Sequence, residues 1–256
     1  MSLIDEKQEA IACIRMAVDN NKLALLSSDA PGDKDVDHDF DSQTQHWQLG
    51  SPEGKKSNLR VMSAELGRTH EEYRSLDERV RDFLACRMPE EATRYETDIH
   101  VSLSIKYSLY LLLMLQAQQY KFVALKYQSR VDWTEMGDIM RCNPDFHGRN
   151  RFDCVVIHDD APGITCARLA GLFRCWLPSG NVFDFALVHG FIPSRWKPRT
   201  LWKGCRVLDE EESTYIVQMD YVLRGALLGP VSEQDGEKSH YFIDTVDSDM
   251  FLRENY

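Results

Sequence analysis

Hydrophobic residues recur at near-helical spacing in two segments of the first half of the chain. The first segment covers residues 1–26, where acidic residues also stand at the start, as in the first turn of a helix. The second apolar stripe runs up to Pro89 and consists of Leu66, Tyr73, Leu76, Val80, Phe83 and Leu84. These patterns predict an N-terminal helix in 1–26 and a helical region in 63–119.

The segment between these two regions has a different composition. Residues 27–62 contain two groups of turn-forming and charged residues, around Pro31-Gly32 and around Pro52-Glu53-Gly54. Such a stretch buries too little apolar surface to offset the entropy lost on ordering. The sequence therefore predicts a flexible acidic linker over 27–62.

From Tyr120 onward the apolar residues follow the short runs of β-strands. Six such runs lie at 121–127, 152–157, 165–176, 182–191, 215–219 and 241–246, and turn-forming residues separate them. Pro178-Ser179-Gly180-Asn181 connects the two strongest runs as a hairpin would. The predicted fold class is α+β, with N-terminal helices beside a C-terminal antiparallel β-barrel-like domain over 120–256.

Composition and charge narrow the functional classes. The 256 residues carry a net charge of −11, which argues against a strong general binder of the phosphate backbone. The seven cysteines include no Cys-x-x-Cys pair, so no zinc ribbon is expected. The start of the chain lacks a secretory signal, and the most apolar stretch, 99–115, is short and contains Lys106. We expect an intracellular protein of the cytoplasm or nucleus that does not enter a membrane.

One segment combines basic and aromatic residues as nucleic-acid-binding surfaces do. Basic groups contact phosphates and aromatic rings stack on bases. The residues in question are Arg195, Trp196, Lys197, Arg199, Trp202, Lys203 and Arg206. The alternative is an ordinary loop whose tryptophans pack back on the domain, and the acidic run 209–212 that follows favours this alternative.

His158, Asp160 and His240 could supply the two imidazoles and one carboxylate of an Fe(II) site, with Arg253 binding a 2-oxoacid. Eight histidines and 41 acidic residues make such a match easy by chance, so solvated residues at turns are the favoured interpretation.

Four aspartates near the C-terminus form a further acidic set, Asp220, Asp244, Asp247 and Asp249. Clustered carboxylates can bind Mg²⁺ or Ca²⁺. The set lacks the glycine and the terminal glutamate of an EF-hand loop. We expect instead that Asp247 and Asp249 cap a turn that leads into residues 250–252.

Several local motifs of the C-terminal half are distinctive as a set. They include Val131-Asp132-Trp133, Arg141-Cys142-Asn143-Pro144 and the tryptophan-rich run 196–202, together with 151–155, 166–169, 172–175, 223–228 and 244–253. In these motifs the chain resembles uncharacterised open reading frames of mushroom-forming fungi, many of them associated with Plavaka (CACTA-like) DNA transposons. The resemblance covers roughly half the chain and implies an accessory domain of a mobile element, without implying a chemistry.

These observations favour a non-enzymatic interaction domain of a transposon-associated protein, with an unknown protein partner and no cofactor. Two alternatives stay open. One is an accessory protein that binds nucleic acid through the basic and aromatic segment, and the other is an Fe(II)/2-oxoacid-type oxygenase.

Overall fold

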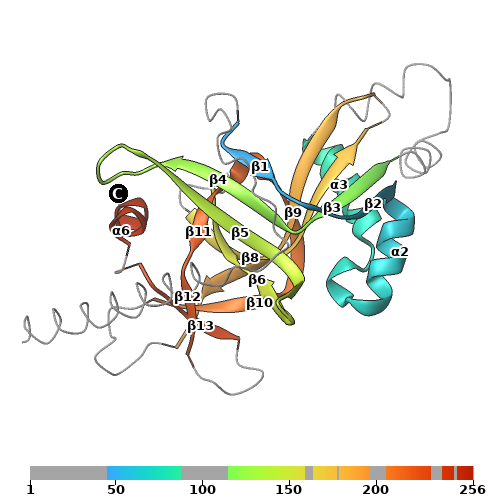
Figure 1. Cartoon of the computed structure of the whole chain (residues 1–256). Coiled ribbons are helices and arrows are strands. Elements are labelled where there is room, and N and C mark those ends of the chain that lie inside the picture. The colour runs from blue at the N-terminus through green and yellow to red at the C-terminus, as the bar shows by residue number, and fades with distance from the viewer. Residues whose placement is uncertain are drawn as a thin grey trace, which may run out of the picture.

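The structure, a computed structural model, describes residues 45–87, 115–158, 164–177, 179–196, 206–231, 238–244 and 247–255 (Figure 1). The helix expected in 1–26 lies outside these residues. No helix of the described part is both long and apolar enough to cross a membrane.

Two of the described helices are packed together near the start of the fold. These are α2 (Leu59–Thr69) and α3 (Leu76–Arg87), separated by a 3₁₀ turn at Glu71–Tyr73. Asn58 begins α2 because its side chain accepts a hydrogen bond from the Arg60 amide. On α3, Leu76, Val80 and Leu84 recur every four residues and are all buried, as the stripe predicts.

Strands make up most of the remaining chain, and they pair in antiparallel fashion throughout. Their bounds are β1 Trp47–Leu49, β2 Pro52–Asn58, β3 Gln116–Tyr120, β4 Phe122–Gln128, β5 Glu135–Phe146, β6 Arg149–Phe152, β7 Cys154–His158, β8 Ile164–Trp176, β9 Val182–Pro193, β10 Arg206–Gln218, β11 Val222–Ala226, β12 Leu228–Pro230 and β13 Ser239–Phe242. A third helix, α6 (Ser248–Asn255), follows them.

The strands form two sheets. The smaller sheet has the order β1-β4-β5-β6, and the larger has the order β11-β7-β8-β9-β10-β13-β12, with β3 joining it through β8 and β2 pairing with β3. The predicted hairpin around residues 178–181 is confirmed, because β8 and β9 pair from Trp176↔Val182 onward. The Leu177 amide donates to the Asn181 carbonyl at this turn.

The expectation of a flexible linker over 27–62 is wrong for its second part. Strands β1 and β2 lie there, and α2 begins at Leu59. Trp47 and Leu49 bury their side chains, and Trp47 pairs with Leu125 of β4. The turn-forming residues of β2 fall in an irregular stretch between Glu53 and Ser57, where Gly54 adopts a φ of 71°.

The expected boundary of the β-rich domain at Tyr120 also needs correction. Strand β3 begins at Gln116, inside the predicted helical region 63–119, and β1 and β2 add two strands from further upstream. The sheets therefore recruit segments from the first half of the chain. The reason is that β3 pairs with β8 along its whole length, from Gln116↔Trp176 to Tyr120↔Leu172.

The mixed α+β class is confirmed, but the sheets are not closed into a barrel. In the described part of the chain, β11 and β12 stand at the two ends of the main strand order of the larger sheet. They follow each other with only Leu227 between them. The chain thus steps directly from one edge of the sheet to the other, and the two edges meet through this covalent link without a ladder of hydrogen bonds.

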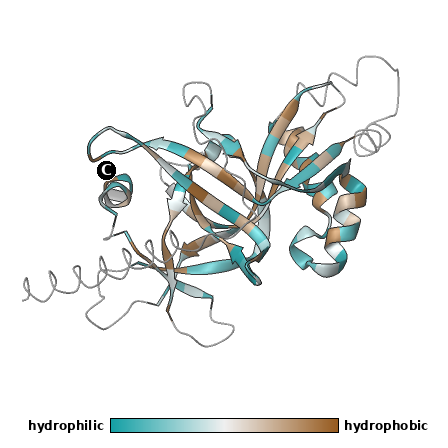
Figure 2. Ribbon diagram, viewed as in Figure 1, coloured by the Kyte–Doolittle hydropathy of each residue, from teal (hydrophilic) through white to brown (hydrophobic). Residues whose placement is uncertain are grey.

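Buried apolar side chains lie between the sheets and beneath the helices. The central cluster includes Leu125, Val155 and Leu169, and a second one joins α2 and α3 to Phe173 and Phe185. A third, smaller cluster includes Phe242 and Met250. Figure 2 shows apolar and polar positions alternating along the strands, as expected where one face of a sheet is buried.

Candidate functional site

Three residues of the predicted basic and aromatic segment are described. Arg195 and Trp196 follow β9 and are exposed, Trp196 by 50%. Arg206 opens β10, where its guanidinium lies 3.1 Å from the Asp244 carboxylate and 5.1 Å from the centre of the Phe242 ring. Lys197, Arg199, Trp202 and Lys203 lie outside the described residues.

The proposed iron ligands are placed as follows. His158 is exposed at the end of β7, and Asp160 lies outside the described residues. His240 has both ring nitrogens engaged: Nδ1 lies 3.0 Å from the Lys238 carbonyl, and Nε2 lies 3.0 Å from Nη2 of Arg168. Because Arg168 can only donate, Nε2 is the acceptor and its lone pair is used. Across the described ranges, no group of three or more His, Cys, Asp or Glu residues is arranged to hold a metal.

Of the two aspartates predicted to cap a turn here, Asp247 acts as the cap, whereas Asp249 lies within α6. Oδ1 of Asp247 accepts hydrogen bonds from the amides of Asp249 and Met250, at 3.0 and 3.2 Å. These amides belong to the first turn of α6, where they have no partner within the helix. Asp247 therefore fixes where α6 begins.

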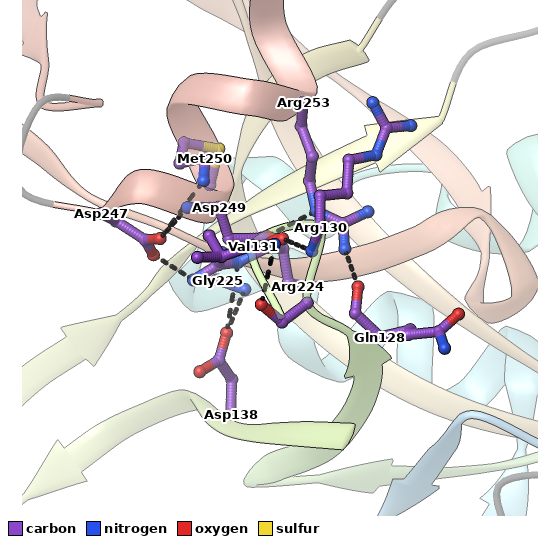
Figure 3. A network of polar contacts seen from close by, with 11 residues as sticks. Gln128, Arg130, Val131, Asp138, Arg224, Gly225, Asp247, Asp249, Met250 and Arg253 are labelled. Carbon is purple, nitrogen blue, oxygen red and sulfur yellow. Dashed lines mark hydrogen bonds and ion pairs between the residues drawn. The ribbon is translucent and has the colours of Figure 1, made fainter. Parts of the chain in front are cut away.

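A buried arginine draws three of the carboxylates in this region together (Figure 3). Arg224 of β11 is only 6% exposed. Its Nη1 donates to Oδ2 of Asp249 at 2.6 Å, and its Nη2 donates to Oδ2 of Asp247. Its Nε lies 3.7 Å from Oδ2 of Asp138 and has no hydrogen-bond partner among the described residues. The guanidinium also stands over the ring of Tyr127, 4.4 Å from its centre.

The same network binds α6 to the turn between β4 and β5. Nε of Arg253 donates to Oδ2 of Asp249 at 2.6 Å, one helical turn away, and its Nη2 donates to the Gln128 carbonyl at 2.5 Å. The backbone amide of Arg130 donates to Oδ1 of Asp249 at 2.5 Å. Asp249 thus links β11, the turn and α6, which makes the end of the molecule a single hydrogen-bonded unit.

Asp138 connects the two sheets. It lies on β5, and its Oδ2 accepts a hydrogen bond of 2.9 Å from the Gly225 amide on β11. Burial raises the pKa of Asp138, although the Gly225 amide and the Arg224 guanidinium act in the opposite direction. Burial also acts to raise the pKa of Asp249, but the hydrogen bonds from Arg253, the Arg130 amide and Arg224 hold it below the ordinary value. Within the same cluster, the pKa of Asp138 is therefore raised and that of Asp249 is lowered.

A groove of about 640 Å³ opens over this network. On one side it is lined by residues 136 and 138–140 of β5, and on the other by residues 224–227 from β11 onward; Asp247, Ser248, Asp249 and Met250 line its end. Neighbouring side chains of a strand point to opposite faces, so a groove lined by consecutive residues runs along the edge of the strand. The groove therefore lies beside the edges of β5 and β11.

On the edge of β5 that is turned away from β4, some backbone groups have no strand partner among the described residues. The Cys142 amide donates to Lys121 on the β4 side, whereas the Arg141 carbonyl accepts from Asp153 on the opposite side. Backbone groups alternate between the two sides, so those of Gly137 and Ile139 point away from β4, like those of Arg141. On the side away from β4, strand β6 pairs only with residues 142–146. Within the described ranges, no strand pairs with Gly137 and Ile139 on that side.

Large apolar side chains are concentrated on this end of the molecule. The described residues include ten exposed large hydrophobic side chains, and five of them belong to β5, the turn before it and the link after β11: Val131, Trp133, Met136, Ile139 and Leu227. We call these five residues the apolar rim. Trp133 is the most exposed at 70%, and the others range from 38% to 54%.

Trp133 is held in an uncommon backbone conformation. Its φ of 63° lies in the left-handed region, which bulky residues rarely adopt. Its amide donates to the Ser129 carbonyl at 3.0 Å, and its carbonyl accepts from the Gln128 side chain at 3.3 Å. A second cavity of about 590 Å³ lies beside Trp133, and Tyr127 lines both this cavity and the groove. The turn thus displays an indole ring on a fixed backbone.

Comparisons with protein-family models, curated proteins and solved structures found no match to this chain. The resemblance to transposon-associated reading frames stays a prediction. The groove itself was missed from the sequence, although Val131-Asp132-Trp133 and 244–253 were noted as distinctive. Two sequence features could have pointed to it. One is a tryptophan and a valine in an otherwise polar turn, and the other is an Asp-x-Asp motif before a short apolar run.

Proposed function

We propose that the chain is a non-enzymatic protein-interaction domain and that it docks its partner on the apolar rim and in the adjacent groove. In keeping with the resemblance of its C-terminal half, we place this domain in a transposon-associated protein. The single observation that carries the proposal is the concentration of exposed apolar side chains at one end of the fold. All of these side chains except Trp133 also line the groove, and patches of exposed apolar side chains mark interaction sites in proteins.

The architecture of this end supports docking. The rim residues stand on β5, on a hydrogen-bonded turn and on the link between β11 and β12. The network around Arg224 fixes these elements relative to each other. A pre-formed surface loses less conformational entropy on binding, which favours affinity. Tryptophan is also the residue type most often found to dominate interface energies.

The test compares the proteins captured by variants of the full chain. Tagged wild-type chain and a Met136→Asp variant are incubated with the same cell extract, and the retained proteins are quantified by mass spectrometry. Val182→Asp is the matched control, because Val182 is as exposed as Met136, 47% against 48%, and lies in the β8–β9 hairpin. We expect proteins that the wild type and the control retain and that the Met136 variant loses. Identical sets for all three chains would contradict the proposal.

A second candidate function is nucleic-acid binding at the end of β9, supported by the exposed pair Arg195 and Trp196. An exposed indole next to a guanidinium can stack on a base and contact a phosphate. The measurement is binding of labelled single- and double-stranded DNA and RNA at two salt concentrations. Salt-sensitive binding that is lost in an Arg195→Ala, Trp196→Ala variant would establish it, and no binding at low salt would remove it.

A further inference from the structure

The geometry points to the chemistry of the partner: we infer that the groove takes an extended peptide segment, which adds to the open edge of β5 and places a lysine or arginine against Asp138 and Asp247. This inference rests on the proposed function, because it names what occupies the same surface. It commits to strand addition, in which backbone hydrogen bonds supply affinity and alternate side chains supply specificity.

The backbone of β5 is the first part of the argument. The amide and carbonyl groups of Gly137 and Ile139 point away from β4 toward a side on which no described strand pairs. Both residues are exposed, and Ile139 lines the groove. An exposed strand edge is a template for another strand. An extended segment is the ligand whose regular backbone groups match it.

The charges of the groove are the second part. Among the described residues, its lining carries three carboxylates, Asp138, Asp247 and Asp249, and one guanidinium, that of Arg224. Asp249 is turned inward and is shared with Arg253, whereas the side chains of Asp138 and Asp247 are 26% and 38% exposed. The accessible charge is therefore negative, and complementarity favours a cationic side chain on the ligand.

The same charges disfavour a second copy of this chain as the occupant. Two β5 edges paired around a two-fold axis would bring each groove, with its exposed Asp138 and Asp247, close to the other. Carboxylates that face each other repel, and like charges opposite one another destabilise a strand pair. A segment from a different protein, or from a basic region elsewhere, avoids this cost.

The register of the predicted pairing sets the sequence pattern of the ligand. Met136 and Asp138 share one face of β5, whereas Ile139 lies on the other. A residue directly opposite Asp138 stands on the same face as its carboxylate, so the basic side chain belongs there. The peptide residue next to the basic one lies opposite Ile139 and is expected to be apolar. The peptide residue two positions from the basic one lies next to Met136 and is also expected to be apolar.

The experiment uses the full chain and a random twelve-residue peptide library displayed on phage. Peptides that bind the wild-type chain and bind the Met136→Asp variant more weakly are sequenced and synthesised. Each is then prepared with single backbone N-methyl groups at successive positions, and binding is measured by fluorescence polarisation. We expect a basic residue flanked by apolar ones, and a loss of more than tenfold on methylation at every second position only. That period of two is the signature of an added strand.

The charge contact is tested with Asp138→Asn and Asp247→Asn, which keep the hydrogen-bond acceptors used by Gly225 and by α6. Each should reduce the preference for lysine over norleucine at the basic position by about five- to tenfold. Asp82→Asn on α3 is the control, since its exposed carboxylate lies outside the groove. Unchanged preference in both variants would overturn the charge assignment.

The outcomes separate this inference from the proposed function. Selected peptides that are acidic, or that tolerate methylation at every position, overturn strand addition while the capture experiment can still show a docking surface. If the library yields no enriched peptide but capture from extract is selective, strand addition is likewise overturned and the docking surface stands. Loss of selective capture together with an unenriched library removes both proposals.

Discussion

Beneath α2 and α3 the molecule is joined by aromatic and aliphatic side chains, whereas beneath α6 it is joined by carboxylates and guanidinium groups. At the first end Phe173 and Phe185 stack with ring centres 5.1 Å apart, and both are fully buried. At the second end Arg224 and Arg253 stand over the Tyr127 ring and share the carboxylate of Asp249. Figure 1 places α2 and α6 on opposite sides of the sheets.

The difference bears on function. Burial of apolar surface stabilises a fold with little dependence on pH, and it leaves nothing for a ligand to recognise. A buried ionic cluster contributes little net stability, because desolvation offsets most of the attraction between the charges. The end beneath α6 is also where the apolar rim and the groove lie. The contrast therefore separates an end that secures the fold from the end where we propose that a partner docks.

The largest effect is expected from Phe173→Ala at the apolar end. Removing the ring leaves a cavity next to Phe185 and Tyr73, whose rings both contact it. Comparable truncations of buried phenylalanines lower the free energy of unfolding by about 4 kcal/mol. Urea unfolding should show this loss equally at pH 7 and pH 5. A loss under about 1 kcal/mol, the range expected of an exposed control such as Val61→Ala, would contradict the assigned packing.

The next effect is expected from Arg224→Met at the polar end. Methionine keeps much of the volume but leaves Asp138, Asp247 and Asp249 without their shared cation. Removing one partner of a buried ion pair, here Arg224 beside the buried Asp249, costs about 3 kcal/mol at pH 7. The loss should shrink as the pH falls toward 4, because the carboxylates then take up protons. If the loss were the same at pH 7 and pH 4, the charge network would not be what holds this end together.

The two ends also differ in how far the sequence predicts them. The buried face of α3 follows from apolar residues at 76, 80 and 84, and the β8–β9 hairpin follows from two strong apolar runs around a turn. Such signals are local and periodic. The strands β1 and β2 were not predicted, because β1 has only three residues and β2 is polar, and such segments become strands only when a partner such as β4 or β3 supplies the pairing.

The candidate site could not be predicted in the same way. Its groups come from residues 127–140, 224–227 and 247–253, which only the sheet topology brings together. One part was local: Asp247 caps the start of α6, as the Asp-x-Asp spacing indicates. That its neighbour Asp249 reaches Arg224 and the Arg130 amide depends on contacts across 25 and 119 positions of the chain.

A smaller effect is expected from Asp249→Asn. The pKa of Asp249 is held below its ordinary value of 3.8 in the folded chain, so its ionised form stabilises the fold above that value. This contribution is lost as the pH falls through the lower, folded-state pKa. Because hydrogen bonds to a charged acceptor contribute about 2 kcal/mol, we expect the variant to lose about that much at pH 6 to 7 and to approach the wild type at strongly acidic pH. If the stability difference between the variant and the wild type grew on acidification, the ionised form of Asp249 would not be what stabilises the fold.

The smallest effect on stability, and the sharpest comparison, comes from Asp138→Asn. The pKa of Asp138 is raised in the folded chain, so its ionised form opposes folding, and the wild type loses stability as the pH rises through 3.8 toward the folded-state pKa. Asparagine keeps an acceptor for the Gly225 amide, so the change at pH 7 should lie within about 1 kcal/mol. Relative to the wild type, the variant should gain stability from pH 3 to pH 7, opposite in sign to Asp249→Asn.

Thermal unfolding across this pH range measures how the stability of each of the two variants changes with pH relative to the wild type. A carboxylate whose charge opposes folding and which lines the groove is what the proposed ligand contact predicts, whereas a large loss in the variant at pH 7 would make Asp138 a structural residue like Asp249.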